Sequence, residues 1–401
     1  MIENDLIKSV GSLFNWVKKE GYYGWDPYDA LHGLITTKMC MGNPYLEMML
    51  IQIGRISPIN MRPILKIQKG IDLKGCALFA RAYAEMCKTV RNKIYLTELC
   101  KMISFLNDNS LKDKYGYECW SSHYFPYTGV DKSRLTPSTP DVIGTSQSII
   151  ALVEGYMITG DEHAKNAALD AWNFLSDKFI ESKTNKIFIK YTLGNDNRIT
   201  INASAQGLEA GCYILKLHQD RQTKNICQKL SRFLVSMQGD DGSWKYSIYD
   251  DGRVRNQLDF HQGFILDALV DYLKYADSKA ELASCIENGI RIYKEKMFLR
   301  DGRSYYRYPA KYPIDIHNQA QGIITFAKYS VLDPQYSDFA NQIAKWTITN
   351  MQDRSGYFYY HKWPLIANKI PYMRWSQAWM MLALATLMEH LRDEYRYTNS
   401  T

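Results

Sequence analysis

The sequence predicts an all-α fold, a closed barrel of six or seven helical hairpins with short turn or strand insertions. Two observations predict it. A polar residue followed by a small one recurs near the start of apolar runs, and amphipathic segments alternate with segments that are apolar on most sides. Self-similarity at a long, nearly fixed period is typical of repeat architectures. We therefore expect about seven copies of one unit around a common axis.

The repeated pair sets the register of these units. The pairs are His32-Gly33, Lys74-Gly75, Gln147-Ser148, Gln206-Gly207, Gln262-Gly263, Gln321-Gly322 and Gln377-Ala378, and the last five are 59, 56, 59 and 56 residues apart. A small residue lets neighbouring helices approach closely. The Gln side chains either bond neighbouring inner helices together or bind sugar hydroxyls, because an amide is both donor and acceptor.

Each unit joins an outer helix to an inner one. Segment 227–238 places Leu230, Phe233, Leu234 and Met237 at the spacing of a helix with one buried face. A turn at 239–242 follows, and segment 259–272 is apolar on most sides, as an inner helix should be. In chain order, we expect inner helices near 28–39 and 73–88, and from 145, 202, 259, 317 and 373. Outer helices are expected near 95–107, 167–180, 227–238, 286–299 and 339–351. The last inner helix is as apolar as the others, which favours a closed ring over an open solenoid with polar caps.

A long insertion at 118–140 interrupts the regular order. It is rich in Pro and aromatic residues and is too long for an ordinary connector. We expect an ordered lid over one end of the barrel, within a single domain spanning residues 1–401.

Composition narrows the functional classes. Hydrophobic content of 46% with 23% charged residues is ordinary for a globular protein. The net charge of +7 comes without a block of like charges, so no nucleic-acid partner is expected. We expect no signal peptide and no membrane span, because no apolar stretch of about 20 residues occurs. Eight Cys without a CxxC pair indicate free thiols in the cytoplasm rather than a metal site or disulfides, and no cofactor is expected.

Two stretches carry a family resemblance. Segment 229–244 is similar to the QW repeat of terpenoid cyclases, with a basic residue, an aromatic, aliphatics, Gln238 and then Gly-x-Trp. Segment 351–357 resembles a degenerate copy, with Tyr357 in place of Trp. The wider resemblance is to α/α toroids, which include terpenoid cyclases, prenyltransferases, six-hairpin glycosidases, polysaccharide lyases and lanthionine synthetases. The cyclase DxDD run is absent, and Cys76 and Cys212 do not reproduce the zinc motifs of the prenyltransferase and synthetase branches. The carbohydrate branch remains.

Residues just before the inner helices should ring one end of the barrel. Asp26, Asp141 and Asp259 form a set suited to glycoside hydrolysis, whereas His261, His317 and Arg374 with a Tyr suit elimination beside a carboxylate. The acids could equally be helix caps, but His, Arg and Trp at the same end do not serve that purpose. The catalytic candidates are Asp141, Asp259, His261 and Asp26. The substrate-binding candidates are Trp25, Asp29, Trp120, His123, Gln206, Gln262, Asp315, His317, Arg374 and Trp375.

The leading hypothesis is a cytoplasmic enzyme of polysaccharide metabolism or biosynthesis. It would act on an oligo- or polysaccharide, uronate-bearing by preference, through glycoside hydrolysis or elimination. One alternative is a terpenoid-type toroid that binds an isoprenoid or lipid-linked intermediate, which predicts a deep apolar cavity. Another is a non-catalytic glycan-binding protein, with no acid pair within about 10 Å across the mouth. The sequence leaves the oligomeric state open.

Overall fold

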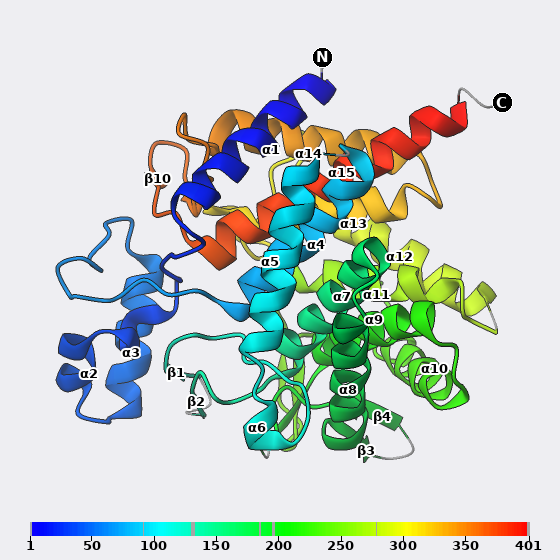
Figure 1. The fold of residues 1–401 in the computed structure, drawn as a ribbon, viewed down its shortest axis with the longest axis horizontal. Helices are drawn as coiled ribbons and strands as arrows, with labels where there is room; N and C mark the ends of the chain where they lie inside the picture. Colours follow the sequence, from blue (N-terminus) through cyan, green and yellow to red (C-terminus); the bar gives the residue numbers. More distant parts are fainter. Residues whose placement is uncertain are drawn as a thin grey trace.

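The computed structural model describes residues 2–90, 92–129, 133–183, 186–194, 197–277 and 279–398. Long helices form two concentric rings in this part of the chain (Figure 1). The inner ring consists of α4 (Leu73–Thr89), α7 (Val142–Thr159), α9 (Ile201–Leu217), α11 (His261–Leu273), α13 (Ile316–Tyr329) and α15 (Trp379–Thr398). The outer ring consists of α1 (Ile2–Lys19), α5 (Lys93–Asp108), α8 (Glu162–Lys178), α10 (Arg221–Ser236), α12 (Lys279–Met297) and α14 (Gln335–Met351).

The ring closes with six hairpins. Successive inner helices contact one another from α4 to α15, and α15 packs back against α4. The sixth outer position is filled by α1, which packs on α15 from the other end of the chain. The predicted closed α/α barrel is confirmed, in its six-hairpin form.

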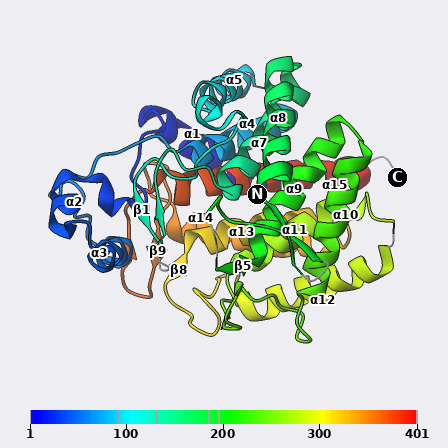
Figure 2. The ribbon, with the colours of Figure 1, turned by 90° about the horizontal axis from the view of Figure 1, so that it is seen from below.

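The prediction of an inner helix at 28–39 is wrong. This segment forms the short 3-10 helix η1 (Asp29–His32) and then α2 (Leu34–Cys40), with Gly33 between them in an extended conformation (φ −114°, ψ 135°). Together with α3 (Pro44–Ile56), it makes a lobe that projects from one side of the barrel (Figures 1 and 2). The pair His32-Gly33 therefore matches the repeat in residue type only.

Short strands lie at the end where the inner helices begin. A three-stranded antiparallel sheet joins β5 (Arg198–Thr200), β6 (Ser247–Tyr249) and β7 (Val254–Arg255). A second joins β8 (Ile314–Asp315), β9 (His361–Lys362) and β10 (Ala367–Asn368), and hairpins pair β1 (Tyr127–Thr128) with β2 (Arg134–Leu135) and β3 (Ile180–Lys183) with β4 (Lys186–Ile189). The remaining elements are α6 (Lys112–Tyr115) and a π-helix, η2 (Met373–Ala378), which leads into α15.

Side-chain capping explains where many helices begin. Asp72, Asp141 and Asp315 accept hydrogen bonds from the first-turn amides of α4, α7 and α13. Each such cap is worth about 1 kcal/mol. Three of the acids that precede inner helices thus have a structural task before any chemical one.

The repeated Gln residues hold the barrel together in two ways. Gln147 Nε2 donates to Gln206 Oε1 at 2.7 Å between α7 and α9, and Gln321 Nε2 donates to Asp267 Oδ2 at 2.7 Å between α13 and α11. Gln262 instead donates to and accepts from the backbone of Trp244. These are bonds between elements of the fold, as one of the two sequence interpretations expects.

The Gln residues that bond neighbouring inner helices and those that bond the backbone do not occupy equivalent positions along their helices. Gln377 bonds both backbone groups of Phe358, as Gln262 does with Trp244. In α13 the matching backbone amide, that of Ser304, donates to Gln319 rather than to Gln321. Gln321 therefore lies two residues further along its helix than Gln262 does.

The small residues of the pairs occur where close approach requires them. A Cβ on Gly207 would come within 2.1 Å of Ile189 Cδ1, and one on Gly322 within 2.3 Å of Phe298 Cζ. The QW-like stretches share the same construction, because β-bridges join Gln238 to Trp244 and Gln352 to Phe358. Phe358, rather than Tyr357, is thus the counterpart of the Trp.

Two further features concern the apolar helix α7 and the cysteines. Among the described residues only α7 is long and apolar enough to cross a membrane, and 78% of that stretch is buried inside the fold, as an inner helix should be. All eight cysteines are free, and six of them are buried.

Candidate functional site

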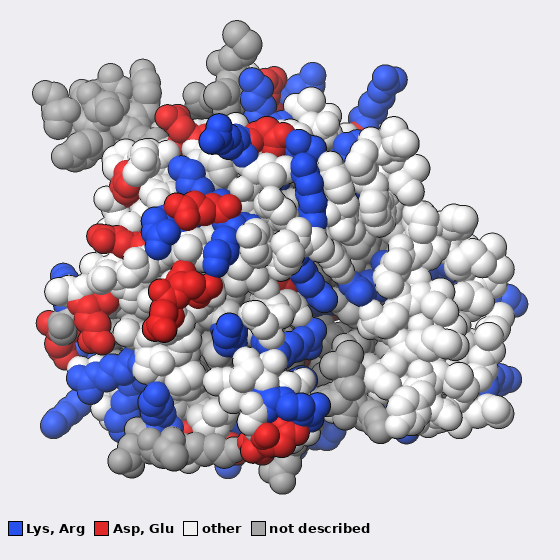
Figure 3. Space-filling view, turned by 180° about the vertical axis from the view of Figure 1, so that it is seen from behind, with Lys and Arg blue, Asp and Glu red and all other residues white. Residues whose placement is uncertain are grey.

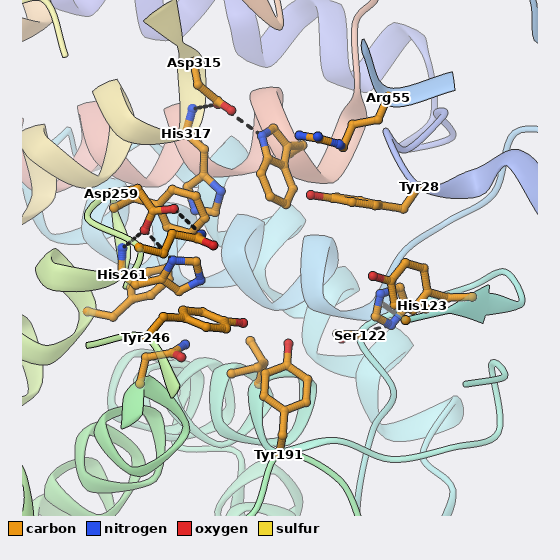
Figure 4. A pocket seen from close by; sticks show the side chains of 18 of the residues that line it. Tyr28, Arg55, Ser122, His123, Tyr191, Tyr246, Asp259, His261, Asp315 and His317 are labelled. Carbon is orange, nitrogen blue, oxygen red and sulfur yellow. Dashed lines mark hydrogen bonds and ion pairs between the residues drawn. The ribbon is translucent and has the colours of Figure 1, made fainter. Parts of the chain in front are cut away.

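A cavity of about 340 Å³ opens at the end of the barrel where the inner helices begin. Its lining includes the first residues of several inner helices, such as Lys74 of α4, His261 of α11 and His317 of α13. The insertion 118–140 and the projecting lobe contribute further walls, through His123 and Arg55 respectively (Figure 4). Most of these side chains are polar or charged, which counts against an isoprenoid ligand.

An Asp–His pair stands at the start of α11. His261 Nδ1 lies 2.6 Å from Asp259 Oδ1, and Gln257 Nε2 donates to the other carboxylate oxygen. Burial raises the pKa of Asp259, but the interaction with His261 and the hydrogen bonds from His261 and Gln257 outweigh it, so the pKa lies below its usual value. The carboxylate is therefore ionised and can accept a proton from Nδ1; in that tautomer of a neutral imidazole, Nε2 is the acceptor nitrogen.

A second histidine lies on the other side of the Phe260 ring. Phe260 stacks on His261 at 4.2 Å and on His317 at 4.1 Å between ring centroids. Trp379 stacks on His317 at 4.7 Å. Burial, together with the charges of Lys74, His261 and Arg374, lowers the pKa of His317 well below its usual value. Neither ring nitrogen of His317 has a hydrogen-bond partner within the described part of the chain, so the cavity holds a neutral imidazole.

Asp315 fixes the indole above this histidine. Trp375 Nε1 donates to Asp315 Oδ1 at 3.2 Å, and His361 Nε2 lies 3.1 Å from Asp315 Oδ2. Tyr28 meets Trp375 edge-on at 5.5 Å between centroids. The result is an aromatic wall of the kind that binds the apolar face of a sugar ring.

Charges cluster at the base of the cavity. Arg374 forms ion pairs with Asp26 at 2.6 Å and with Asp72 at 3.4 Å. Lys74 lines the same region, and burial, reinforced by the charge of Arg374, lowers its pKa to about 8. Since Arg374 is already paired with the Asp26 carboxylate at 2.6 Å, Lys74 is a second cation in this region that can meet an anionic ligand.

The insertion forms the wall opposite the Asp–His pair. His123 stacks on Tyr127 at 5.1 Å, and its ring nitrogen Nδ1 lies 3.2 Å from Ser122 Oγ. Burial and the charges of Arg374 and Lys74 lower the pKa of His123 well below its usual value.

Three tyrosines direct their hydroxyls into the same space. They are Tyr28, Tyr191 and Tyr246 (Figure 4). Burial raises the pKa of all three phenols, so each keeps its proton at neutral pH. The Tyr246 ring lies 4.7 Å from that of His261, which brings a proton donor beside the candidate base.

The lining is rich in positive charge. Two carboxylates line the cavity, those of Asp259 and Asp315. Six cationic side chains also line it: Arg55, Lys74, Arg198, Arg255, Arg307 and Arg374. Arg307 Nε lies 3.8 Å from Asp259 Oδ2, and Arg55 donates to the Tyr306 hydroxyl at 2.8 Å. A cleft of one sign of charge concentrates ligands of the opposite sign, and anionic ligands are favoured here.

The structure brings half of the sequence-predicted site residues together. Those that line the cavity are His123, Asp259, His261, Asp315, His317, Arg374 and Trp375. The others do not line it: Trp25, Asp26, Asp29, Trp120, Asp141, Gln206 and Gln262.

Two predicted catalytic acids are committed to structural bonds. Asp141 accepts four hydrogen bonds, from the amides of Ile143 and Gly144 and from the amide and hydroxyl of Ser122. Asp26 is fully buried under Arg374. Among the binding candidates, Asp29 pairs with Arg62 at 2.7 Å, and Trp120 donates from Nε1 to a backbone carbonyl in the core.

Several lining residues are absent from the sequence-predicted set. Lys74 belongs to the repeated pairs and Asn202 is the second residue of α9, so both could have been found. Tyr191, Tyr246 and Arg55 could not, because nothing local distinguishes them from the other tyrosines and arginines of the chain. Among the described residues, no group of three or more His, Cys, Asp or Glu side chains is placed to hold a metal ion.

No protein-family model matches the chain, and no curated protein matches it in sequence. Solved structures match it in fold. A cellobiose 2-epimerase from Bacillus thermoamylovorans has a TM-score of 0.64 at 14% identity, over 96% of this chain and 99% of that one. An unsaturated glucuronyl hydrolase from a Bacillus species has a TM-score of 0.66 at 11% identity, over 96% of both chains. An α-mannanase from Bacteroides thetaiotaomicron has a TM-score of 0.62 at 13% identity, over 82% of this chain and 88% of that one. The α/α-toroid resemblance drawn from the sequence is confirmed as a fold.

Proposed function

We propose that this chain is a carbohydrate-active enzyme that removes the proton beside the carboxylate of a uronate-containing saccharide and eliminates the neighbouring glycosidic oxygen. One observation carries the proposal. The His261 imidazole is fixed by Asp259 at 2.6 Å, and it lines a cavity rich in cationic side chains. A positioned general base of this kind contributes about 10²–10⁴-fold to the rate of proton transfer.

The proton and electron balance of the reaction fits the residues present. His261 Nε2 takes the proton from the uronate C5, and the electron pair of the broken C–H bond forms the C4=C5 double bond. The C4–O bond breaks, and the leaving oxygen takes a proton from the Tyr246 hydroxyl. Base and acid stand side by side, with ring centroids 4.7 Å apart, so both act on the same face of the sugar.

Negative charge develops on the uronate carboxylate when C5 loses its proton. Lys74 at the base of the cavity and Arg307 at its rim are placed to neutralise that charge. Fixed cations in a partly desolvated cavity stabilise such a transition state without reorganising. This is the physical reason to prefer an acidic saccharide over a neutral one.

Hydrolysis is the less favoured reaction. It requires one protonated carboxylic acid and a second carboxylate across the scissile bond. Asp141 and Asp26 do not line the cavity, and the pKa of Asp259 lies below its usual value, which opposes a role as the acid.

Epimerisation is a second candidate, favoured by His317. Its neutral imidazole lines the cavity on the opposite side of Phe260 from His261. Two such groups could remove a proton from one face of a carbon and return one to the other.

The test is an assay of the purified protein against a panel of uronate polysaccharides. Elimination creates a double bond conjugated to a carboxylate, which is followed by its ultraviolet absorbance. His261→Gln should abolish this signal, whereas His163→Gln, at an exposed position on α8, should leave it unchanged. Deuterium incorporation from heavy water without chain cleavage would identify epimerisation instead. Reducing ends that appear without absorbance or exchange would overturn the proposal in favour of hydrolysis.

A further inference from the structure

The projecting lobe exposes an unusual amount of apolar surface. We define the lobe as residues 33–66, which include α2 and α3. Of the 23 large apolar side chains that are exposed in the described part of the chain, 11 belong to this short segment. Exposed apolar side chains gathered on one short segment of a folded protein indicate an interaction site.

The helix α3 has two apolar faces. Ile51 faces inward and is buried, and Leu46 and Leu50 pack with it against the core of the lobe. The second face carries Tyr45, Met49, Ile53 and Ile56, which are between 51% and 61% exposed and follow one another at spacings of four, four and three residues. These spacings place them in one stripe along the helix, and Met49, Ile53 and Ile56 of that stripe each expose more than half of their surface.

The flanking segments extend the apolar surface. Leu34 and Met41 at the two ends of α2 are 78% and 85% exposed, and Ile59 and Ile64 in the loop after α3 are 69% and 68% exposed. The ribbon shows the lobe as a protrusion from the barrel (Figure 1), and these exposed side chains belong to it. Side chains at such a protrusion can enter the headgroup–acyl boundary of a bilayer while the barrel stays in water.

The exposed charged residues of the lobe are basic. Lys38 and Lys66 are exposed. The acid of the lobe, Glu47, is paired with Arg134 at 3.0 Å and accepts from Thr128 at 2.6 Å. The view from behind the molecule shows this side as largely uncharged, with basic residues at its border and the acids elsewhere (Figure 3). Anionic phospholipid headgroups complement such a surface, because basic side chains beside an apolar face are drawn to them.

The lobe is also part of the reaction cavity. Gln52 and Arg55 of α3 line it, while Met49, Ile53 and Ile56 of the same helix are exposed. A surface that engages the exposed side of α3 therefore lies close to the mouth of the cavity.

We propose that the lobe docks on a membrane surface that contains anionic phospholipid. The apolar side chains of α3 and of the neighbouring segments enter the headgroup–acyl boundary, and Lys38 and Lys66 meet the lipid phosphates. Docking holds the cavity at the bilayer surface, where saccharides attached to lipids are found. It does not depend on the proposed reaction, since it is measured without substrate.

The test is co-sedimentation of the full chain with vesicles of phosphatidylcholine alone or mixed with phosphatidylglycerol. We expect binding to the mixed vesicles that weakens with salt. The triple variant Met49→Ser, Ile53→Ser, Ile56→Ser should bind at least about tenfold more weakly. The matched control replaces Met157, Val331 and Leu332 by Ser, because these are apolar residues with 57%, 75% and 48% exposure outside the lobe. It should bind like the unmodified chain.

A second variant tests the charges without touching the apolar stripe. The double variant Lys38→Glu, Lys66→Glu should lose the preference for phosphatidylglycerol. If the triple variant unfolds, this double variant still tests the proposal. Equal binding by the unmodified chain and both lobe variants, or no binding to either vesicle, would overturn the proposal. So would a lipid-independent dimer that the triple variant dissociates, since the face would then bind a second copy of the chain. Vesicle binding is measured without substrate and does not require His261. Failure of docking can therefore be told apart from failure of the proposed reaction.

Discussion

The Asp259–His261 pair allows a test of which side chain reacts with the substrate. If the imidazole reacts, His261→Gln should lose more kcat than Asp259→Asn, and if the carboxylate reacts, the order should be reversed. In elimination His261 is the base, so His261→Gln removes the group that takes the proton and should lower kcat by about 10²–10⁴-fold. Asp259 only holds the imidazole. Asp259→Asn keeps an oxygen that can accept the Nδ1 proton but removes the charge from a 2.6 Å bond. A charge-assisted hydrogen bond is worth about 1.5–3 kcal/mol, which corresponds to a loss of about 10- to 150-fold.

The assay is initial-rate kinetics by ultraviolet absorbance over a range of pH, with melting temperatures measured on the same samples. The reasoning is refuted if Asp259→Asn abolishes turnover while His261→Gln stays within about tenfold. The carboxylate itself would then be the reacting group.

Three further predictions concern charge and packing. Lys74→Met should lower kcat/KM for an acidic saccharide, with a fall in kcat, because the cation that offsets the charge developing in the transition state is lost. Burial lowers the pKa of Lys74 to about 8, so kcat/KM of the unmodified chain should fall above that pH and that of the variant should not. Burial raises the pKa of Asp267 to about 7. The neutral carboxyl therefore contributes its full stability below a pH of about 4, and this contribution is lost as pH rises through about 7. Asp267→Asn should raise the melting temperature by a few degrees at pH 8 and change it little at pH 4. Gly144→Ala places a Cβ 2.8 Å from the Ser121 carbonyl carbon and should cost about 1–3 kcal/mol of stability, seen as a lower melting temperature. Gly11→Ala, with no atom within 4 Å of its Cβ, is the control and should not lower it.

The barrel could be predicted because its signal is local. One helix with a single apolar stripe and the next with apolar residues on most sides imply two rings wherever they recur. The number of hairpins could not, because closure depends on a contact between α1 and α15 at opposite ends of the chain. The pair at Gly33 matches the repeat in residue types, and only its extended backbone shows that no inner helix passes through it.

The site was predictable in part for a related reason. Positions before an inner helix do reach one end of the barrel, and this found His261, His317 and Trp375. The register slip between Gln262 and Gln321 then blurs which of these positions face the cavity. Arg55 enters from the lobe and Tyr246 from the strand region before α11. Their positions depend on tertiary contacts that no spacing within one unit encodes.

Asp141 and Asp259 show why residue type alone misplaces the chemistry. Both precede an inner helix, and both are almost fully buried. A carboxylate offers about four acceptor sites, and at Asp141 the backbone of α7 and Ser122 use four. A reaction there would have to break the cap that starts the helix. At Asp259 one oxygen is bonded to an imidazole that lines the cavity, so its charge acts on a group that can meet substrate. The difference lies in the partners of each carboxylate, and it directs the candidate chemistry to the histidine.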